Sequence, residues 1–214
     1  MTSLPLILVG SDLRVLVIGG GPVAAEKLRT LLAGGLRPTV MAEKVGDAMR
    51  TLIDEHDLEC RQRPFRDGDT DGYALTVVAS GGDRELAERV RDEVTARGAL
   101  VNCADFAELG NVHFPATTRR GPLTVSISTG GASATYATWL RERVDATIPD
   151  NAELVLGRLA RVRGRLKERA AARGVTLRAM MRRFVDNAGF DAIAEPGMTD
   201  EEVVGAVDAA WERE

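Results

Sequence analysis

Three glycines directly follow a short apolar run near the start of the sequence, and their spacing predicts phosphate binding. They fit the pattern G-x-G-x-x-A, and the preceding run Val15–Ile18 is typical of a strand buried on both faces. The helix that follows would offer free backbone N–H groups to a pyrophosphate, and this strand-to-helix setting favours a dinucleotide site over a merely structural turn. The residues assigned to the cofactor here are Gly19, Gly21, Pro22, Val23 and Ala24.

Acidic and small residues also follow the ends of the next predicted strands. Glu43 lies about twenty residues after the glycines, where an acidic side chain accepts hydrogen bonds from the adenosine ribose and repels a 2′-phosphate. This position favours NAD over NADP, although a solvated carboxylate beside Lys44 explains it equally well. Ser80 and Gly81 follow the third strand, where a small loop can approach the cofactor, or where the chain only forms a helix cap with Asp83 as N-cap.

A carboxylate and a second glycine turn supply candidates for chemistry beyond the cofactor. Asn102 ends the fourth predicted strand on the same edge, and Asp105 follows as a candidate acid or base, or as an ordinary turn aspartate. At Thr129, Gly130 and Gly131 a strand again runs into glycines and then a helix, which would suit the carboxylates of a substrate; a plain turn is the alternative.

These residues need a parallel sheet to bring them together. Apolar runs alternate with helical patterns up to about position 104, which is typical of βαβ units and a Rossmann-like α/β fold. The predicted elements are strands Val15–Ile18, Arg37–Ala42, Thr76–Ala79 and Ala99–Asn102, and helices Pro22–Leu32 and Asp83–Ala96.

The alternation ends after Asp105. Val112–Phe114 and Leu123–Ser128 are predicted as strands of a hairpin joined by the basic turn Arg119–Pro122, followed by a helix over Ser133–Val144. Beyond Asn151 apolar residues recur at helical spacing. We therefore expect an NAD-binding Rossmann domain at 1–111, a small α+β unit at 112–149, and a helical C-terminal domain at 150–214.

Composition narrows the class of protein. The 214 residues are 44% hydrophobic and 28% charged, which is ordinary for a globular protein, and the net charge of -4 argues against a surface devoted to nucleic acid. The sequence shows neither a signal peptide nor a membrane-spanning run, so we expect a cytoplasmic protein. Cys60 and Cys103 stand far apart without a metal-binding motif, which predicts reduced structural thiols and no metal site.

A basic stretch in the helical region needs an explanation of its own. Between Arg158 and Arg183 there are ten basic residues and one acidic residue, Glu168. Such a helix can contact nucleic acid, a membrane or a polyanionic substrate, while a solvated outer face is the commonest explanation.

Taken together, the motifs resemble the precorrin-2 dehydrogenase family, the siroheme-synthase module that in some members also inserts iron into sirohydrochlorin. The resemblance covers roughly the first 145 residues. It rests on an ordered set of segments: Leu4–Leu6, Val17–Ala24 with Lys27, Asp83–Leu86, Val101–Asn102 with Asp105, Phe114–Ala116, Arg120–Leu123, and Ile127–Gly131 followed by Leu140–Arg141.

The resemblance implies a homodimer that oxidises precorrin-2 to sirohydrochlorin and passes a hydride to NAD+. It makes the small unit at 112–149 a dimerisation and substrate unit. It makes Asp105 the first choice as a base or as an orienter of the substrate, and it adds Arg120 to the substrate-binding residues. The many carboxylates of the substrate would also give the basic stretch a purpose. Two alternatives stay open, namely a bifunctional dehydrogenase and ferrochelatase, and a non-catalytic NAD-sensing module.

Overall fold

The computed structural model describes residues 3–10 and 12–213. The chain divides into two compact units, and the boundary in the sequence lies between Phe114 and Pro115. Among the described residues, no helix is both long enough and apolar enough to cross a membrane. Each unit is considered by itself below.

The first unit is built on a five-stranded parallel sheet. Its strands are β1 (Val15–Ile18), β2 (Thr39–Met41), β3 (Cys60–Arg61), β4 (Leu75–Val78) and β5 (Leu100–Cys103), in the order β3-β2-β1-β4-β5. From β1 the chain builds outward to β2 and β3, and it then returns to place β4 on the other side of β1. Parallel sheets of this topology bind ligands at the carboxyl ends of the strands where the direction of building reverses, and here that point lies between β1 and β4.

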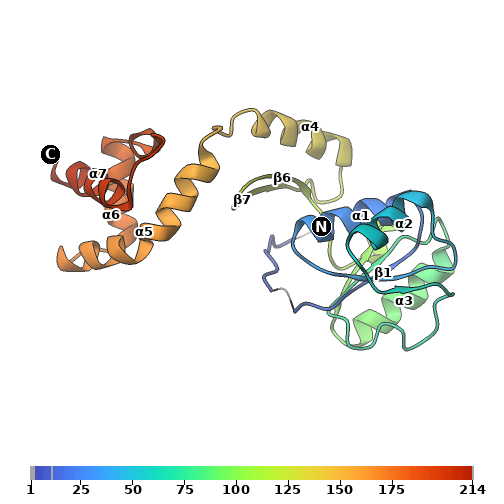
Figure 1. Ribbon diagram of the computed structural model, residues 1–214. Helices are drawn as coiled ribbons and strands as arrows, with labels where there is room; N and C mark the ends of the chain where they lie inside the picture. The colour runs from blue at the N-terminus through green and yellow to red at the C-terminus, as the bar shows by residue number, and fades with distance from the viewer. Residues whose placement is uncertain (1–2, 11, 214) are drawn as a thin grey trace. The chain divides into compact units, whose positions relative to one another are not determined.

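Helices cover both faces of this sheet, which is why its central strands are apolar throughout (Figure 1). The helices α1 (Pro22–Ala33) and α2 (Asp47–Glu55) pack against Val15 and Val17 on one face. The helix α3 (Arg84–Ala96) packs against Leu16 and Ile18 on the other face. A short 3-10 helix, Ala107–Leu109, follows β5. The Rossmann-like fold predicted from the sequence is therefore confirmed.

Two details of the predicted order differ from the structure. The sequence analysis predicted no element in the stretch where α2 and β3 lie. The strand β3 has only two residues, and the N-cap of α2 is Gly46, which has no side chain to mark the start of a helix. The predicted strand Val112–Phe114 is wrong. The Val112 N–H donates to the carbonyl of Val101 (3.2 Å), so this segment lies along β5 instead of starting a hairpin.

The second unit begins with the hairpin. The strands β6 (Ala116–Arg120) and β7 (Leu123–Ile127) pair antiparallel around Gly121 and Pro122, and the helix α4 (Ala134–Asp145) packs on them. The chain then forms α5 (Ala152–Ala172), α6 (Leu177–Asn187), a 3-10 turn (Phe190–Ile193) and α7 (Asp200–Glu212), which share one apolar core. The antiparallel unit and the helical region are confirmed, while the predicted domain boundaries after 111 and 149 stay predictions.

Candidate functional site

The glycine loop after β1 is wedged between two neighbouring loops of the sheet. Gly19 has φ +128, and a Cβ atom there would collide with the carbonyl oxygen of Ala79 at the end of β4. A Cβ atom on Gly20 would collide with the carbonyl oxygen of Lys44, beyond the end of β2. The loop is fixed by hydrogen bonds from Gly19 N to the Met41 carbonyl (2.8 Å) and from Gly46 N to the Gly20 carbonyl (3.0 Å). Only glycine fits at these two positions.

Gly21 is different, because the space beside it is open. It is the N-cap of α1 in an extended conformation, and no heavy atom lies within 4 Å of the position that its Cβ atom would take. No side chain caps this helix, Pro22 begins it, and Val23 in its first turn is exposed, so backbone N–H groups are left for an anion. Ala24 is fully buried beneath Gly19. These residues fit the pyrophosphate of a dinucleotide.

Glu43 is exposed in the loop after β2, the loop that also supplies the carbonyl group packed on Gly20. It therefore lies at the same edge of the sheet as the glycine loop, one strand away from β1. Its role toward the ribose stays a prediction.

Asp105 lies on the other side of the glycine loop, beyond β4. One of its carboxylate oxygens, Oδ2, accepts hydrogen bonds from Gly81 N (3.0 Å) and from Ser80 Oγ (3.2 Å). The side chain is exposed. The carboxyl edge of the sheet thus carries, in spatial order, the Glu43 loop, the glycine loop, the Ser80–Gly81 loop and the Asp105 carboxylate. The glycine loop and the Ser80–Gly81 loop flank the point where the sheet reverses, and Asp105 lies one strand further along.

Several neighbours of Asp105 have structural tasks. Asp83 caps α3 by accepting the Leu86 N–H (3.0 Å), as the capping alternative predicted. Asn102 is buried, and its Nδ2 donates to the Val112 carbonyl (2.9 Å), which fastens the following segment along β5. Its Oδ1 has no partner among residues 3–10 and 12–213, so a cofactor contact for Asn102 stays a prediction. Burial raises the pKa of the Cys103 thiol to about 11, so this cysteine remains a neutral thiol.

The second glycine turn is more self-contained than the first. Gly130 and Gly131 have φ +62 and +87, and the Thr129 hydroxyl accepts the Ser133 N–H (3.1 Å) across the turn. The Ser133 side chain in turn caps α4 by accepting the Tyr136 N–H (3.1 Å). Since α4 has its own serine cap, this turn offers an anion fewer free groups than the start of α1 does. The assignment of Thr129, Gly130 and Gly131 to substrate stays a prediction.

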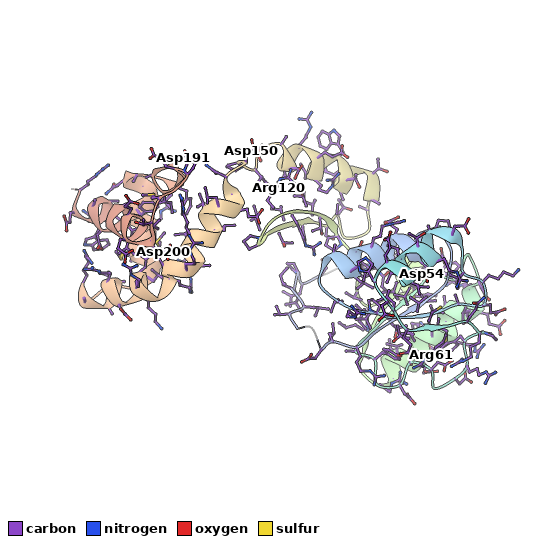
Figure 2. All side chains as sticks on the ribbon, viewed as in Figure 1. Asp54, Arg61, Arg120, Asp150, Asp191 and Asp200 are labelled. Carbon is purple, nitrogen blue, oxygen red and sulfur yellow. The ribbon has the colours of Figure 1, made fainter. Side chains whose placement is uncertain are left out.

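Arg120, which Figure 2 labels, lies at the end of β6 and forms an ion pair. Its Nη2 lies 2.8 Å from the Asp145 carboxylate of α4. A hydrogen bond from the Thr118 hydroxyl and the neighbouring Arg120 hold the pKa of the Asp145 carboxyl below its ordinary value. The contacts therefore show a structural pair, and the substrate role of Arg120 stays a prediction.

An aromatic pair on α4 was missed by the sequence reasoning. Tyr136 and Trp139 are exposed with ring centroids 5.2 Å apart, and the Arg143 guanidinium lies 4.5 Å from the Trp139 centroid. With Ser133 and Thr135 these rings line a hollow of about 410 Å³. Their spacing of three and four residues was the available signal, because it places all three side chains on one face of the helix.

Most arginines of the basic stretch contact other groups of the helical region. Arg158 is 2% exposed and its Nη1 donates to the Ile193 carbonyl (2.6 Å), so the hypothesis that it contacts the substrate is wrong. Other arginines of α5 pair with acidic residues of α7, beginning with Asp200, which Figure 2 marks at the start of that helix. The pairs are Arg161–Asp200 (3.1 Å), Arg165–Glu201 (2.9 Å) and Arg169–Asp208 (3.7 Å). Arg173, which directly follows α5, also lies 3.0 Å from Asp208.

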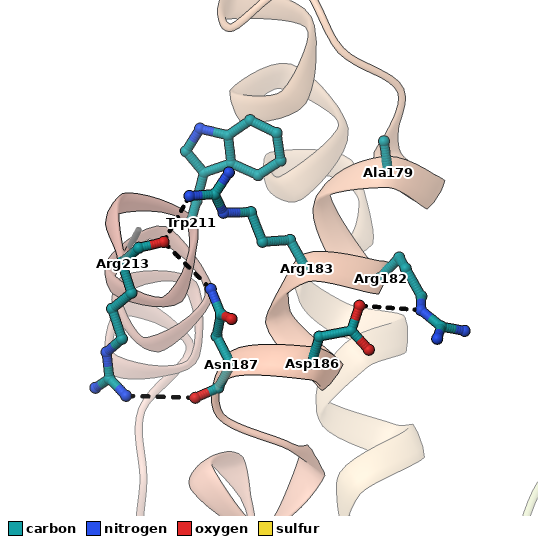
Figure 3. A pocket seen from close by; sticks show the side chains of 7 residues that line it. All are labelled: Ala179, Arg182, Arg183, Asp186, Asn187, Trp211 and Arg213. Atoms are coloured by element: carbon teal, nitrogen blue, oxygen red, sulfur yellow. Dashed lines mark hydrogen bonds and ion pairs between the residues drawn. The ribbon is translucent and has the colours of Figure 1, made fainter.

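A hollow of about 530 Å³ also lies in the helical region, between α6 and α7 (Figure 3). The guanidinium of Arg183 lies 5.1 Å from the centroid of the Trp211 ring, and its Nη2 donates to the Arg213 carbonyl (2.5 Å). Asn187 donates to the same carbonyl (3.3 Å), and Arg182 pairs with Asp186 (3.1 Å). The polar groups of this hollow mainly satisfy one another.

The fold and the glycine loop together define a dinucleotide-binding protein of the Rossmann type. Residues 6–116, more than half of the chain, match the NAD(P)-binding family, and the chain belongs to that family. Residues 120–147 match the family described as sirohaem biosynthesis protein central.

Two known siroheme synthases are similar in sequence to this chain. The chain is 36% identical over 168 residues to a siroheme synthase of Pseudomonas paraeruginosa, covering 78% of this chain and 36% of that protein. It is 33% identical over 214 residues to a siroheme synthase of Nitrosococcus oceani, covering 99% of this chain and 44% of that protein. The chain thus spans less than half the length of these relatives.

One solved structure, named SirC, precorrin-2 dehydrogenase, has the same fold. Its TM-score is 0.71 at 23% identity, with 95% of this chain and 100% of that chain covered. The resemblance to the siroheme-synthase module, predicted from the motifs, is confirmed.

Proposed function

We propose that the chain is an NAD-dependent precorrin-2 dehydrogenase, which oxidises precorrin-2 to sirohydrochlorin. The observation that carries this proposal is the Asp105 carboxylate, held by the Ser80–Gly81 loop at the same sheet edge as the glycine loop. The names of the related siroheme synthases and of the structurally similar precorrin-2 dehydrogenase support the choice of substrate.

The reaction removes two hydrogens from the substrate, one as a hydride with its electron pair and one as a proton. Bound NAD+ supplies the hydride acceptor. In this chain the N–H groups of the first turn of α1 bind the pyrophosphate beside Gly21. Asp105 accepts the proton, because one of its carboxylate oxygens is held by Ser80 and Gly81 while the other has no partner in the described part of the chain.

The decisive experiment compares NADH formation from precorrin-2 by the wild type, Asp105→Ala and Asp54→Ala. Asp54 is an exposed aspartate of α2 and serves as the matched control (Figure 2). We expect turnover by the wild type and the control, and a loss of at least a hundredfold in Asp105→Ala, the order of a missing acid–base group. If all three proteins bind NAD+ and none reduces it, the chain is an NAD-sensing module. Full activity of Asp105→Ala would remove Asp105 from the mechanism.

We infer further that Arg120 and the Thr129–Gly131 turn bind carboxylates of the substrate. Arg120 would have to share its guanidinium between Asp145 and a carboxylate, which a planar group with five N–H donors is able to do. Arg120→Gln should then raise the KM for precorrin-2 and leave the affinity for NAD+ unchanged. An unchanged KM would assign Arg120 to the Asp145 pair alone.

The proposal also includes a homodimer formed through residues 112–149 and a location in the cytoplasm. Exposed aromatic side chains are typical of interfaces, and Tyr136 and Trp139 are exposed in this unit. We expect Trp139→Lys to reduce the mass measured by light scattering from two chains to one, while Val185→Lys, at an exposed apolar position of α6, does not. A wild-type monomer would refute the dimer, and cell fractionation tests the location.

A further inference from the structure

The Asp105 carboxylate is fastened to the loop of the neighbouring strand and to no other described group. Two hydrogen bonds reach the same oxygen, Oδ2, from two successive residues, Ser80 and Gly81. The sequence predicted that these two residues bind the cofactor, whereas in the structure both donate hydrogen bonds to the Asp105 carboxylate.

The sheet itself brings the two loops together. The hydrogen-bond ladder continues one residue past each strand, from Ala79 N to the Ile18 carbonyl (2.9 Å) and from Ala104 N to the Val78 carbonyl (2.8 Å). Ser80 and Asp105 therefore leave the sheet directly after a residue whose position is fixed. The register between β4 and β5, which pairs Val78 with Cys103, therefore sets the position of Asp105.

The backbone after Ser80 has a conformation that suits this contact. Gly81 has φ +67 and Gly82 has φ +94, so two successive residues are in the left-handed region, which side chains with a Cβ atom rarely adopt. This turn follows Ala79, whose carbonyl oxygen also packs on Gly19 of the dinucleotide loop. One short segment thus contacts the glycine loop at Ala79 and holds Asp105 through Ser80 and Gly81.

We propose that Ser80 and Gly81 are the positioning residues of Asp105, and that they hold its carboxylate at the angle from which the free oxygen takes the substrate proton. The inference rests on the proposed function, in which Asp105 is the base. Proton transfer demands that the acceptor be held close to its working geometry. A carboxylate on an exposed loop would otherwise turn freely about its χ angles.

The kinetic test uses Ser80→Ala, Ser80→Thr and a control in which a hydroxyl is lost elsewhere in the same unit. Thr51→Ala is that control, since the Thr51 hydroxyl donates only to the Asp47 carbonyl within α2. We expect kcat to fall roughly fivefold to tenfold in Ser80→Ala, the scale of one ordinary protein hydrogen bond, because this bond is exposed and 3.2 Å long. The KM for NAD+ should stay constant, and Ser80→Thr should restore most of kcat.

A double-mutant cycle separates positioning from direct contact with the cofactor. If Ser80 acts through Asp105, then Ser80→Ala should have no further effect on the residual activity of Asp105→Asn. An equal loss of activity on Ser80→Ala in the wild type and in Asp105→Asn, or a raised KM for NAD+, would overturn the proposal. Either result would indicate that Ser80 contacts the dinucleotide directly. Full activity of Asp105→Asn would instead refute the role of Asp105 as the base. The cycle therefore distinguishes failure of the proposed function from failure of this inference.

A measurement that needs no turnover tests the contact directly. The Gly81 N–H donates to Asp105, so its hydrogen exchange should be slower in the wild type than in Asp105→Ala, while the exchange of the Leu86 N–H, bonded to Asp83, should be the same in both. Equal exchange of Gly81 in the two proteins would show that the contact is absent in solution and would overturn the proposal.

Discussion

Replacing Gly21 by alanine should weaken the binding of NAD+ without destabilising the protein. Gly21 has φ -85 and ψ -178, an extended conformation that alanine adopts freely, and no heavy atom lies within 4 Å of its Cβ position. Alanine restricts the unfolded chain, which favours folding by about 0.4–1 kcal/mol. Alanine is also a poorer N-cap than glycine, which offsets this gain, so the free energy of unfolding should stay nearly constant. The new methyl group would occupy the space through which the pyrophosphate approaches, and such overpacking costs about 1–3 kcal/mol. The Kd for NAD+ should therefore rise roughly 5- to 150-fold.

Gly19→Ala is the matched control, because the same methyl group is added two residues earlier. There φ is +128 and the Cβ atom would collide with the Ala79 carbonyl of β4. Backbone strain of this kind costs about 1–3 kcal/mol, and displacement of the β4 carbonyl adds to it. Gly19→Ala should lower the free energy of unfolding by at least that amount.

Urea unfolding and calorimetric titration with NAD+ distinguish the two variants. In Gly21→Ala the affinity should fall while the stability stays nearly constant, and in Gly19→Ala both should fall. Wild-type affinity in Gly21→Ala would refute the assignment of this loop to the pyrophosphate. A loss of stability equal to that of Gly19→Ala would show that Gly21 is needed for the fold itself.

Three further predictions concern other parts of the molecule. Glu43→Ala should reduce the preference for NAD+ over NADP+ about tenfold in Kd, because a ribose acceptor and its repulsion of the 2′-phosphate are lost; an unchanged ratio would make Glu43 a solvated carboxylate. Arg158→Met should lower the free energy of unfolding by about 1.5–3 kcal/mol in urea, since the Ile193 carbonyl loses a charged donor, and should leave NAD+ affinity unchanged. Hydrogen bonds from Arg63 hold the pKa of the Asp69 carboxyl below its ordinary 3.8, so it stabilises the fold above that pH and the contribution is lost as pH falls through the lowered pKa. Asp69→Asn should therefore destabilise most at neutral pH, and a difference from the wild type that stayed constant from pH 7 to pH 2 would contradict this.

The nucleotide-binding half was predictable because its signals are local. A buried strand, a glycine turn and a helix that begins with proline succeed one another within 19 residues, from Val15 to Ala33, and each has one physical explanation. The hairpin was predicted with its first strand misplaced, since Val112 has the apolar side chain of a strand residue but forms its hydrogen bond with Val101, eleven positions back. Only tertiary pairing decides between those two arrangements.

The contacts of Asp105 could not be predicted for the same reason. They depend on the register between β4 and β5, which is set by packing across the whole sheet and not by the residues around Ser80 or Asp105. Arg158, in contrast, carried a signal that was available. It lies three residues after Val155 and four before Val162, on the apolar face of its helix, so burial was the better prediction for it than solvent exposure.

The burial of Arg158 and the pairing of its neighbours also change where the charge for a polycarboxylate should be sought. The arginines of α5 are largely matched by Asp200, Glu201 and Asp208 of α7, and a carboxylate ligand would have to compete with them. Arg143 is exposed, forms no ion pair within the described part of the chain and lies over the exposed indole of Trp139. A flat, carboxylated molecule matches a cation beside an aromatic face better than it matches a helix whose charges are already paired. If the substrate is a tetrapyrrole, the unit that carries α4 therefore has stronger physical grounds for contacting it than the basic stretch between Arg158 and Arg183.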